Sequence, residues 1–203
     1  MMKHATLMKV FGSIAVLGAA SSVAALGTFA SFTSSTSASQ AISSGSVSIA
    51  LGATGAANRL TVAASGLVPG DTVQRAVDLT SASTDPLGSV SLQTSGLPNN
   101  ALLTDANGLT VKVDKCTVPW TESGTAPAYT YTCTGGTSSN VLAASAVGST
   151  TSLSGLAALS TGTSTDHLLV TLALPTAATN TLQGLSTSIT YAFNGTQRTA
   201  TNK

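Results

Sequence analysis

Short runs in which apolar and small polar residues alternate recur along the chain, and this period of two is the feature that most restricts its fold. In an extended strand, neighbouring side chains point to opposite faces, so each run predicts a strand with one buried face. The runs lie at residues 47–51, 60–64, 72–80, 89–94, 109–116, 129–133, 167–174 and 186–194, separated by Gly, Pro and Asn. We therefore expect an all-β fold, an antiparallel jelly-roll-like β-sandwich. Residues 138–160 have mixed apolar spacing, and we expect a short helix or a packed loop there.

Two loops carry turn chemistry. In Leu67–Asp71, Pro69 presets the first central dihedral angle and Gly70 accepts a positive φ, which predicts a type II turn. Asp105-Ala106-Asn107-Gly108 resembles the start of a calcium loop, but Cys116 stands where that motif needs a bidentate Glu. An Asn-Gly hairpin turn is therefore expected before the strand that begins near residue 109.

The first thirty residues have the pattern of an export signal. Lys3 and Lys9 form a short positive region, and an uncharged run from Val10 to Ala30 follows. A retained membrane helix is the competing interpretation, because about twenty apolar residues span a bilayer. Small residues at the end of the run favour a signal peptide over residues 1–30, cleaved around Thr28-Phe29-Ala30-Ser31. The mature protein would then be secreted to the extracellular space or cell surface and would keep no membrane span.

The chain carries very little charge. Eight Lys plus Arg stand against seven Asp plus Glu, a formal charge of +1, and only 7% of the residues are charged. No basic stripe is present that could neutralise a row of phosphates, so nucleic acid is not expected as a partner. The polar surface must consist mainly of hydroxyl and backbone groups.

Cys116 and Cys133 are the only cysteines. In an exported chain an even pair predicts a disulfide, and closing a loop of this length restricts the unfolded chain by about 3 kcal/mol in the entropic model. A reactive thiol pair is the alternative, although the spacing is unlike a redox motif.

Residues for catalysis are scarce. His167 is the only histidine of the expected mature chain, so a two-histidine zinc motif cannot form within it. A Ser-His-Asp set built from Asp166, His167 and a serine lacks a nucleophile elbow, and we interpret His167 as an exposed residue at the start of a strand. No enzymatic activity, metal or cofactor is expected.

Three aromatic residues, Trp120, Tyr129 and Tyr131, lie near the cysteines. They could form a sugar-stacking platform, which is the basis of an alternative function: a monomeric cell-surface binding module, either an adhesin or a glycan-binding domain. Because only 4% of the residues are aromatic, packing around the disulfide-bonded hairpin is the favoured interpretation.

Three stretches carry a resemblance to a known family. They are Gly27–Phe32 at the end of the signal segment, Ser44–Ile49 followed by Leu67–Asp71, and Asn180–Gly184 with the later Ile189, Tyr191, Phe193 and Gln197. In this order they resemble the TasA and camelysin proteins, which build extracellular fibres of microbial biofilms. The first stretch is similar to the cleavage region that the family's dedicated signal peptidase recognises.

The resemblance implies a secreted structural subunit of an extracellular filament or biofilm matrix fibre. Its jelly-roll domain, residues 44–203, would polymerise with copies of itself by donor-strand complementation, in which the arm of one subunit, residues 31–43, completes the sheet of the next. The arm has no Pro and no charge, so it can pair with an open edge without desolvating an ion. If it is extended, Phe32, Ser34, Thr36 and Ala38 share one face, and Phe32 is the main apolar anchor. A disordered arm is the alternative.

The chain also departs from the family pattern. It has fewer charged residues than the well-known members, a shorter middle segment and a cysteine pair that they need not have. Some relatives are named metalloproteases, but the scarcity of histidine argues against that activity here.

Overall fold

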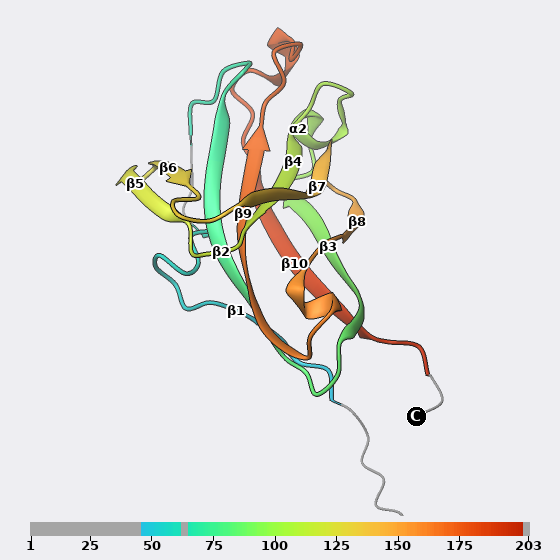
Figure 1. Ribbon diagram of the computed structural model, residues 1–203. Coiled ribbons are helices and arrows are strands. Elements are labelled where there is room, and N and C mark those ends of the chain that lie inside the picture. Colours follow the sequence, from blue (N-terminus) through green and yellow to red (C-terminus); the bar gives the residue numbers. More distant parts are fainter. Residues whose placement is uncertain (1–45, 62–64, 201–203) are drawn as a thin grey trace, which may run out of the picture. The chain divides into compact units, whose positions relative to one another are not determined.

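The computed structural model describes residues 46–61 and 65–200, most of them in antiparallel strands (Figure 1). The strands are β1 (Ile49–Leu51), β2 (Thr72–Ala82), β3 (Leu87–Leu97), β4 (Thr110–Cys116), β5 (Thr121–Thr125), β6 (Ala128–Thr132), β7 (Ser138–Ala146), β8 (Thr150–Leu153), β9 (Thr163–Ala173) and β10 (Ser188–Gln197). The helical elements are α2 (Ala101–Thr104) and the 3₁₀ turns η1 (Ala157–Leu159) and η2 (Asn180–Leu182). Within these described ranges no helix has the length and apolarity to cross a membrane. The predicted signal peptide, its cleavage region and the predicted donor arm lie outside the described residues.

Two sheets pack face to face. Sheet A has five strands in the order β1-β2-β9-β4-β7, and sheet B has three in the order β10-β3-β8. The strands β5 and β6 form a separate hairpin and pair only with each other. All of these pairings are antiparallel, so the expected antiparallel β-sandwich is confirmed.

The alternation in the sequence places one side of each strand in a common core. The buried cluster joins Val77, Leu79, Val111, Val113, Leu168 and Val170 from sheet A with Val90, Leu92 and Leu153 from sheet B. Burying each of these side chains contributes roughly 1.5–3 kcal/mol. The core therefore lies between the two sheets, as the period-two pattern predicts.

The strand expected at residues 60–64 is wrong as far as the structure describes it. Leu60 and Thr61 lie in a turn, and residues 62–64 are outside the described ranges. The side chain of Asn58 accepts a hydrogen bond from the backbone N–H of Leu60 at 3.1 Å. Such a local bond offers the backbone an alternative to a strand ladder, and alternation alone does not reveal it.

The helix or packed loop expected over residues 138–160 is also wrong for most of that segment, which forms β7 and β8 before the short turn η1. The pairing of β7 with β4 shifts register on both sides of Val113, so β7 is bulged. As a result the consecutive residues Val141 and Leu142 are both buried. A bulge breaks the period of two, which explains the mixed spacing in the sequence.

The turn at Val68–Asp71 has the features predicted for type II. Gly70 has φ 98°, and the Asp71 N–H donates to the Val68 carbonyl at 2.9 Å. The Asp71 carboxylate closes the turn further, because its Oδ2 accepts from the Val68 N–H at 2.9 Å. This turn sets the start of β2.

The Asn107-Gly108 pair lies in a turn, but the expected hairpin is wrong because the short helix α2 precedes it instead of a strand. The Gly108 N–H donates to the Asp105 carbonyl at 2.9 Å, and Asp105 Oδ1 accepts from the Asn107 N–H at 2.8 Å. The helix is capped by Asn100, whose Oδ1 accepts from the Leu102 N–H at 3.0 Å. Asn is among the residues most favoured at a helix N-cap. Because α2 has only four residues, the sequence shows no helical period that would reveal it.

Asp166 is a buried charge that connects three parts of the fold. Its carboxylate accepts the backbone N–H groups of Ala157 at 2.8 Å and Ala158 at 3.2 Å, at the start of η1. Lys115 Nζ on β4 lies 3.6 Å from Asp166 Oδ1 and also donates to the Gly155 carbonyl. The carboxylate thus joins β9, β4 and the segment between β8 and β9, and its charge is compensated by a cation and two donors.

Replacing Asp166 by Ala should lower the free energy of unfolding by about 3–5 kcal/mol, because Lys115 and two backbone N–H groups lose their buried partner. Asp114→Ala is the matched control: it removes the partner of Lys112, whose side chain is 47% exposed, and one hydrogen bond from Asn140, and should cost about 1–2 kcal/mol. Urea unfolding followed by Trp120 fluorescence measures both. Equal losses in the two variants would contradict the assigned role of the Asp166 network.

Candidate functional site

A disulfide holds the β5–β6 hairpin beside sheet A. Cys116 is the last residue of β4 and Cys133 follows β6, and their sulfur atoms are bonded with Cα atoms 5.7 Å apart. A two-stranded hairpin alone is marginally stable in water, so it needs such attachments. The disulfide predicted from the sequence is confirmed, and it fits an extracellular protein.

Aromatic side chains pack the hairpin onto the outer face of sheet A, the face turned away from sheet B. Tyr131 is only 8% exposed and contacts Ala76 and Leu169, with Trp120 and Tyr129 packed against this cluster. The indole Nε1 of Trp120 donates to the His167 carbonyl at 2.9 Å. The favoured packing interpretation is therefore confirmed, and a buried Tyr131 cannot serve as part of an open sugar-stacking platform.

An ion pair joins the hairpin to the segment that follows β1. Arg59 donates two hydrogen bonds to the carboxylate of Glu122 in β5, from Nε to Oε2 at 2.9 Å and from Nη2 to Oε1 at 2.8 Å. The Tyr131 hydroxyl donates to Glu122 Oε2 at 2.9 Å, and the Arg59 guanidinium lies 4.9 Å from the centre of the Tyr129 ring. Because the pair is bidentate, it fixes orientation as well as distance.

The environment of this cluster shifts the pKa values of two members in opposite directions. The hydrogen bond from Arg59 lowers the pKa of Glu122, assisted by the bond from Tyr131 and opposed by burial. Burial, with the bond to Glu122, raises the pKa of Tyr131 to about 12. Glu122 is therefore held as a carboxylate and Tyr131 as a neutral donor at neutral pH.

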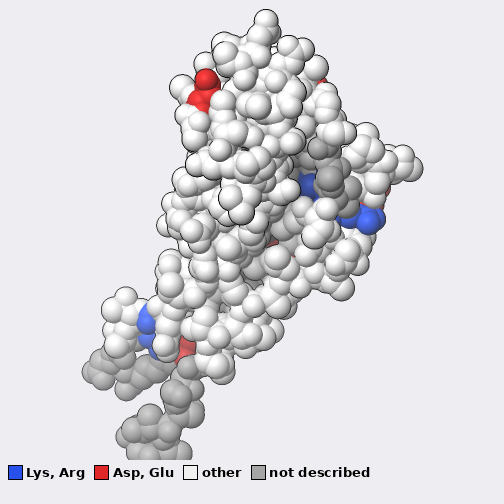
Figure 2. Space-filling model, turned by 180° about the vertical axis from the view of Figure 1, so that it is seen from behind, with Lys and Arg blue, Asp and Glu red and all other residues white. Residues whose placement is uncertain are grey.

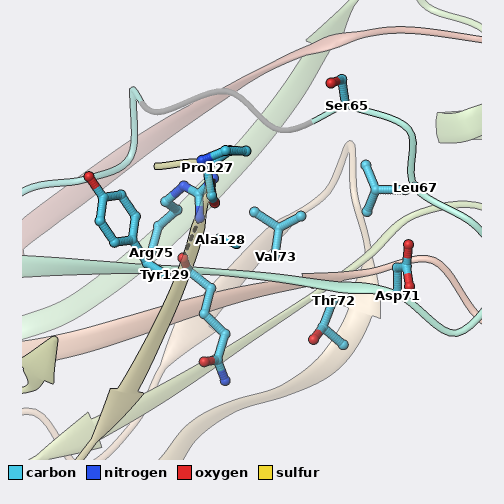
Figure 3. A pocket seen from close by; sticks show the side chains of 10 residues that line it. Ser65, Leu67, Asp71, Thr72, Val73, Arg75, Pro127, Ala128 and Tyr129 are labelled. Carbon is cyan, nitrogen blue, oxygen red and sulfur yellow. Dashed lines mark hydrogen bonds between the residues drawn. The ribbon is translucent and has the colours of Figure 1, made fainter. Parts of the chain in front are cut away.

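A pocket of about 170 Å³ lies where the hairpin meets the first half of β2 (Figure 3). Its walls include Leu67 and Val73 on one side and Pro127 and Tyr129 of the hairpin on the other. Arg75 reaches across it, donating from Nη1 to the Gln74 carbonyl at 2.7 Å and from Nη2 to the Pro127 carbonyl at 3.1 Å. The lining thus combines apolar surface with a buried guanidinium group.

The edge of β2 beside this pocket is only partly covered. On the side away from β9, the Ala76 carbonyl accepts from the Arg59 N–H at 2.9 Å and the Asp78 N–H donates to the Ala57 carbonyl at 2.8 Å. Backbone groups change sides at every residue, so those of Thr72 and Gln74 face the same way as those of Ala76 and Asp78. β1 pairs only with Leu79–Ser81, and no strand within the described ranges pairs with this side of Thr72–Gln74. The Arg75 side chain occupies the Gln74 carbonyl, so the N–H groups of Thr72 and Gln74 and the Thr72 carbonyl are the groups that face this edge for a further strand.

His167 does not lie at the start of a strand, as expected, but in the middle of β9, and its side chain is only 18% exposed. The register of β2 and β9 places it opposite Asp78, and its Nδ1 lies 2.7 Å from Asp78 Oδ1. Asp166, its neighbour in sequence, is on the other face of β9 in the Lys115 network. No Asp166–His167 pair is formed, since adjacent residues of a strand point to opposite faces.

No group of three His, Cys, Asp or Glu side chains suited to holding a metal ion occurs among residues 46–61 and 65–200. His167 is the one histidine in these ranges, and it is bonded to Asp78. These residues do not fit a metal-dependent catalytic centre. Thr28, Phe29, Ala30, Ser31, Phe32, Ser34, Thr36 and Ala38, expected to act in processing and assembly, all lie outside the described ranges.

The fold and this site define a β-sandwich protein with a disulfide-tied hairpin and a partly unpaired sheet edge. The chain belongs to the camelysin family: the family model described as camelysin metallo-endopeptidase matches residues 6–202. This is the TasA and camelysin family that the sequence resembles, and its proteins are secreted. A comparison with curated proteins found no match.

The ion pair makes the attachment of the hairpin pH-dependent. The pKa of Glu122 in the folded protein lies below its ordinary value of 4.5. Its contribution to the stability of the hairpin attachment is therefore present above pH 4.5 and is lost as pH falls through the folded pKa. The pKa of Tyr131 is raised from 10 to about 12, so its contribution to the stability of the attachment is present below pH 10 and is lost as pH rises through about 12.

Glu122→Gln should speed amide exchange in β5 and β6 at neutral pH, because the ion pair with Arg59 is lost, and should remove the acid dependence of that exchange. Exchange in β2 and β9 is the internal control; unchanged hairpin exchange in Glu122→Gln would contradict the assignment.

Proposed function

We propose that this chain is a secreted structural subunit of an extracellular filament or biofilm matrix fibre that assembles head-to-tail by donor-strand complementation. Its parts are a signal peptide over residues 1–30, removed by a dedicated signal peptidase, a donor arm over residues 31–43 and the β-sandwich domain over residues 44–203. The observation that carries the proposal is the partly covered edge of β2. Membership of the camelysin family is consistent with it.

The edge of β2 is suited to accept one more strand above β1. Ile49 of β1 fills the gap between β2 and β10, since a Cβ placed on Gly195 of β10 would lie 3.3 Å from Ile49 Cγ2. Further along β2, Thr72 and Gln74 line the same pocket as Val73 and Tyr129. An added strand would continue the line of β1, pairing its backbone with this edge and burying alternate side chains in the pocket.

The arm has the matching chemistry. Its backbone can supply the ladder, and its lack of charge means that no ion is desolvated on insertion. Phe32 is the only aromatic residue of the arm, and burying it contributes roughly 1.5–3 kcal/mol. Ser34, Thr36 and Ala38 on the same face are small enough for a narrow groove.

The positions of the chain entry and the open edge favour a chain of subunits over a closed dimer. The Ser46 N–H donates to Thr84 Oγ1 and the Ser48 N–H to Ser83 Oγ, each at 3.0 Å, just beyond the end of β2. Thr72 lies at the other end of this strand, and eleven extended residues span roughly 35 Å. In Figure 1, β1 lies toward the bottom and the start of β2 near the top. An arm that leaves one end and binds the other end of the next copy makes a heterologous contact, which propagates.

A metal-dependent peptidase activity, which the family model's description names, is not what these residues support. The ligand set is missing from the described ranges and His167 is engaged by Asp78. A monomeric binding module is also less well supported, because Tyr131 is buried and Trp120 packs against the same cluster and donates to the His167 carbonyl.

Phe32→Asp in the mature protein should abolish or strongly slow filament formation, because a carboxylate would lose its hydration in the acceptor groove without a partner. Thr33→Asp is the matched control, since Thr33 lies on the opposite face of an extended arm. Negative-stain electron microscopy and light scattering measure assembly, and circular dichroism checks the fold. The donor-strand proposal fails if a protein lacking residues 31–39 still forms filaments.

The acceptor edge can be tested separately with a labelled peptide of residues 31–43 and a protein that begins at residue 44. Gln74→Pro removes an N–H that faces away from β9, so the sheet keeps its ladder while the incoming strand loses a donor. The dissociation constant of the peptide should rise about tenfold or more, as expected for about 1.4 kcal/mol. Gln74→Ala keeps the N–H and should bind as the unaltered protein does. Equal binding by the proline variant would place the acceptor elsewhere.

A further inference from the structure

Among residues 46–61 and 65–200, the outer face of sheet B, turned away from sheet A, carries no charged side chain. The outward positions of β3, β8 and β10 alternate with core positions and hold Ser, Thr, Asn, Gln or Ala, with the exposed Leu97 at one end. Across the strands Thr190 lies opposite Ser95, Asn194 opposite Ser91, and Ser91 opposite Ser152. The face is therefore three strands wide and consists of hydroxyl, amide and methyl groups.

The outer face of sheet A is different. It carries the pairs Lys112–Asp114, with nitrogen and oxygen 2.9 Å apart, and His167–Asp78 at 2.7 Å, and the hairpin covers part of it. Near sheet B the ion pair Asp85–Arg198, 3.8 Å apart, lies beyond the end of β10. The rear view in Figure 2 shows a broad surface with few Lys, Arg, Asp or Glu.

A charged side chain on the face of a sheet opposes contact with another face, because the ion would lose its hydration. The three strands of sheet B, β3, β8 and β10, contain no charged residue. Hydroxyl and amide groups both donate and accept hydrogen bonds, so one copy of the face can satisfy another in either orientation. No ion has to be desolvated when two such faces meet.

We infer that the outer face of sheet B is a lateral contact surface for the same face of a second copy, and that it packs neighbouring filaments side by side. This inference rests on the proposed filament. The occupant is a second copy because the face is neutral and self-complementary, and because its area suits a repeated contact better than a free dimer. The strands β3, β8 and β10, of eleven, four and ten residues, offer roughly 400 Å² per copy.

Two such faces would bury roughly 800 Å² in total, below the roughly 1,200–2,000 Å² of stable interfaces. Free subunits should therefore stay monomeric through this face. Along a filament the same contact is repeated at every subunit, and linked weak contacts give strong overall binding. Lateral bundling should thus follow filament formation and should not precede it.

The test is a pair of lysines on sheet B, Ser152→Lys with Thr190→Lys, which lie on the two outer strands with β3 between them. Ala82→Lys with Thr165→Lys adds the same charge to the outer face of sheet A and is the matched control. Filaments of the three proteins are compared by electron microscopy and by low-speed sedimentation of bundles. The sheet B variant should form single filaments with at least about tenfold less bundled material, because unpaired ammonium groups would be desolvated in the contact. Added salt should restore part of the bundling.

The outcomes separate the two proposals. Filaments of the sheet B variant that bundle as well as the control overturn the lateral contact and leave the filament proposal intact. If unaltered filaments bundle only after a neutral polysaccharide is added, the face binds a glycan and the direct lateral contact is overturned. Absence of filaments from all three proteins, at concentrations where each is folded, overturns the proposed function and this inference together.

Discussion

The antiparallel ladder between β2 and β9 is the interaction on which the rest of the structure depends. It pairs all eleven residues from Thr72 with Ala173 to Ala82 with Thr163. The register turns Val77 and Leu168 into the core, and it places Ala76 and Leu169 together on the outside, where Tyr131 packs. The same ladder leaves the other side of β2 as an edge, which β1 covers for only three residues. Core, hairpin and open edge are thus consequences of one pairing.

The second constraint is the small number of charged side chains, several of which stabilise a local connection. Asp71 closes the turn before β2, Glu122 attaches the hairpin through Arg59, and Asp166 joins η1 to Lys115. Each of these charges stabilises one connection instead of spreading over the surface. The outer face of sheet B is left to Ser, Thr and other uncharged residues, which can approach another β surface without desolvating an ion. The fold and the proposed assembly therefore draw on the same composition.

Much of the fold could be predicted because period-two alternation reports directly on which side of a strand is buried. This holds for β2, β3, β4, β6, β9 and β10, whose runs in the sequence overlap the observed strands. It fails where local chemistry interferes: Asn58 bonds to Leu60 and ends the extension, and the bulge beside Val113 brings Val141 and Leu142 into the core together. The disulfide and the packing of the aromatic residues were also predictable, because few other partners exist for them.

By itself, the sequence determined the strand-rich class, the cysteine pair, the scarcity of histidine and the uncharged segment that precedes the sandwich. Only the tertiary structure decided which groups act together. It paired His167 with Asp78 across 89 residues and Arg59 with Glu122 across 63, and it placed Asp166 on the face opposite its neighbour. It also revealed that no strand within the described ranges pairs with the side of Thr72–Gln74 away from β9, where the Gln74 carbonyl accepts from Arg75. Such pairings depend on strand order and register, which join residues far apart in the chain and leave no local pattern.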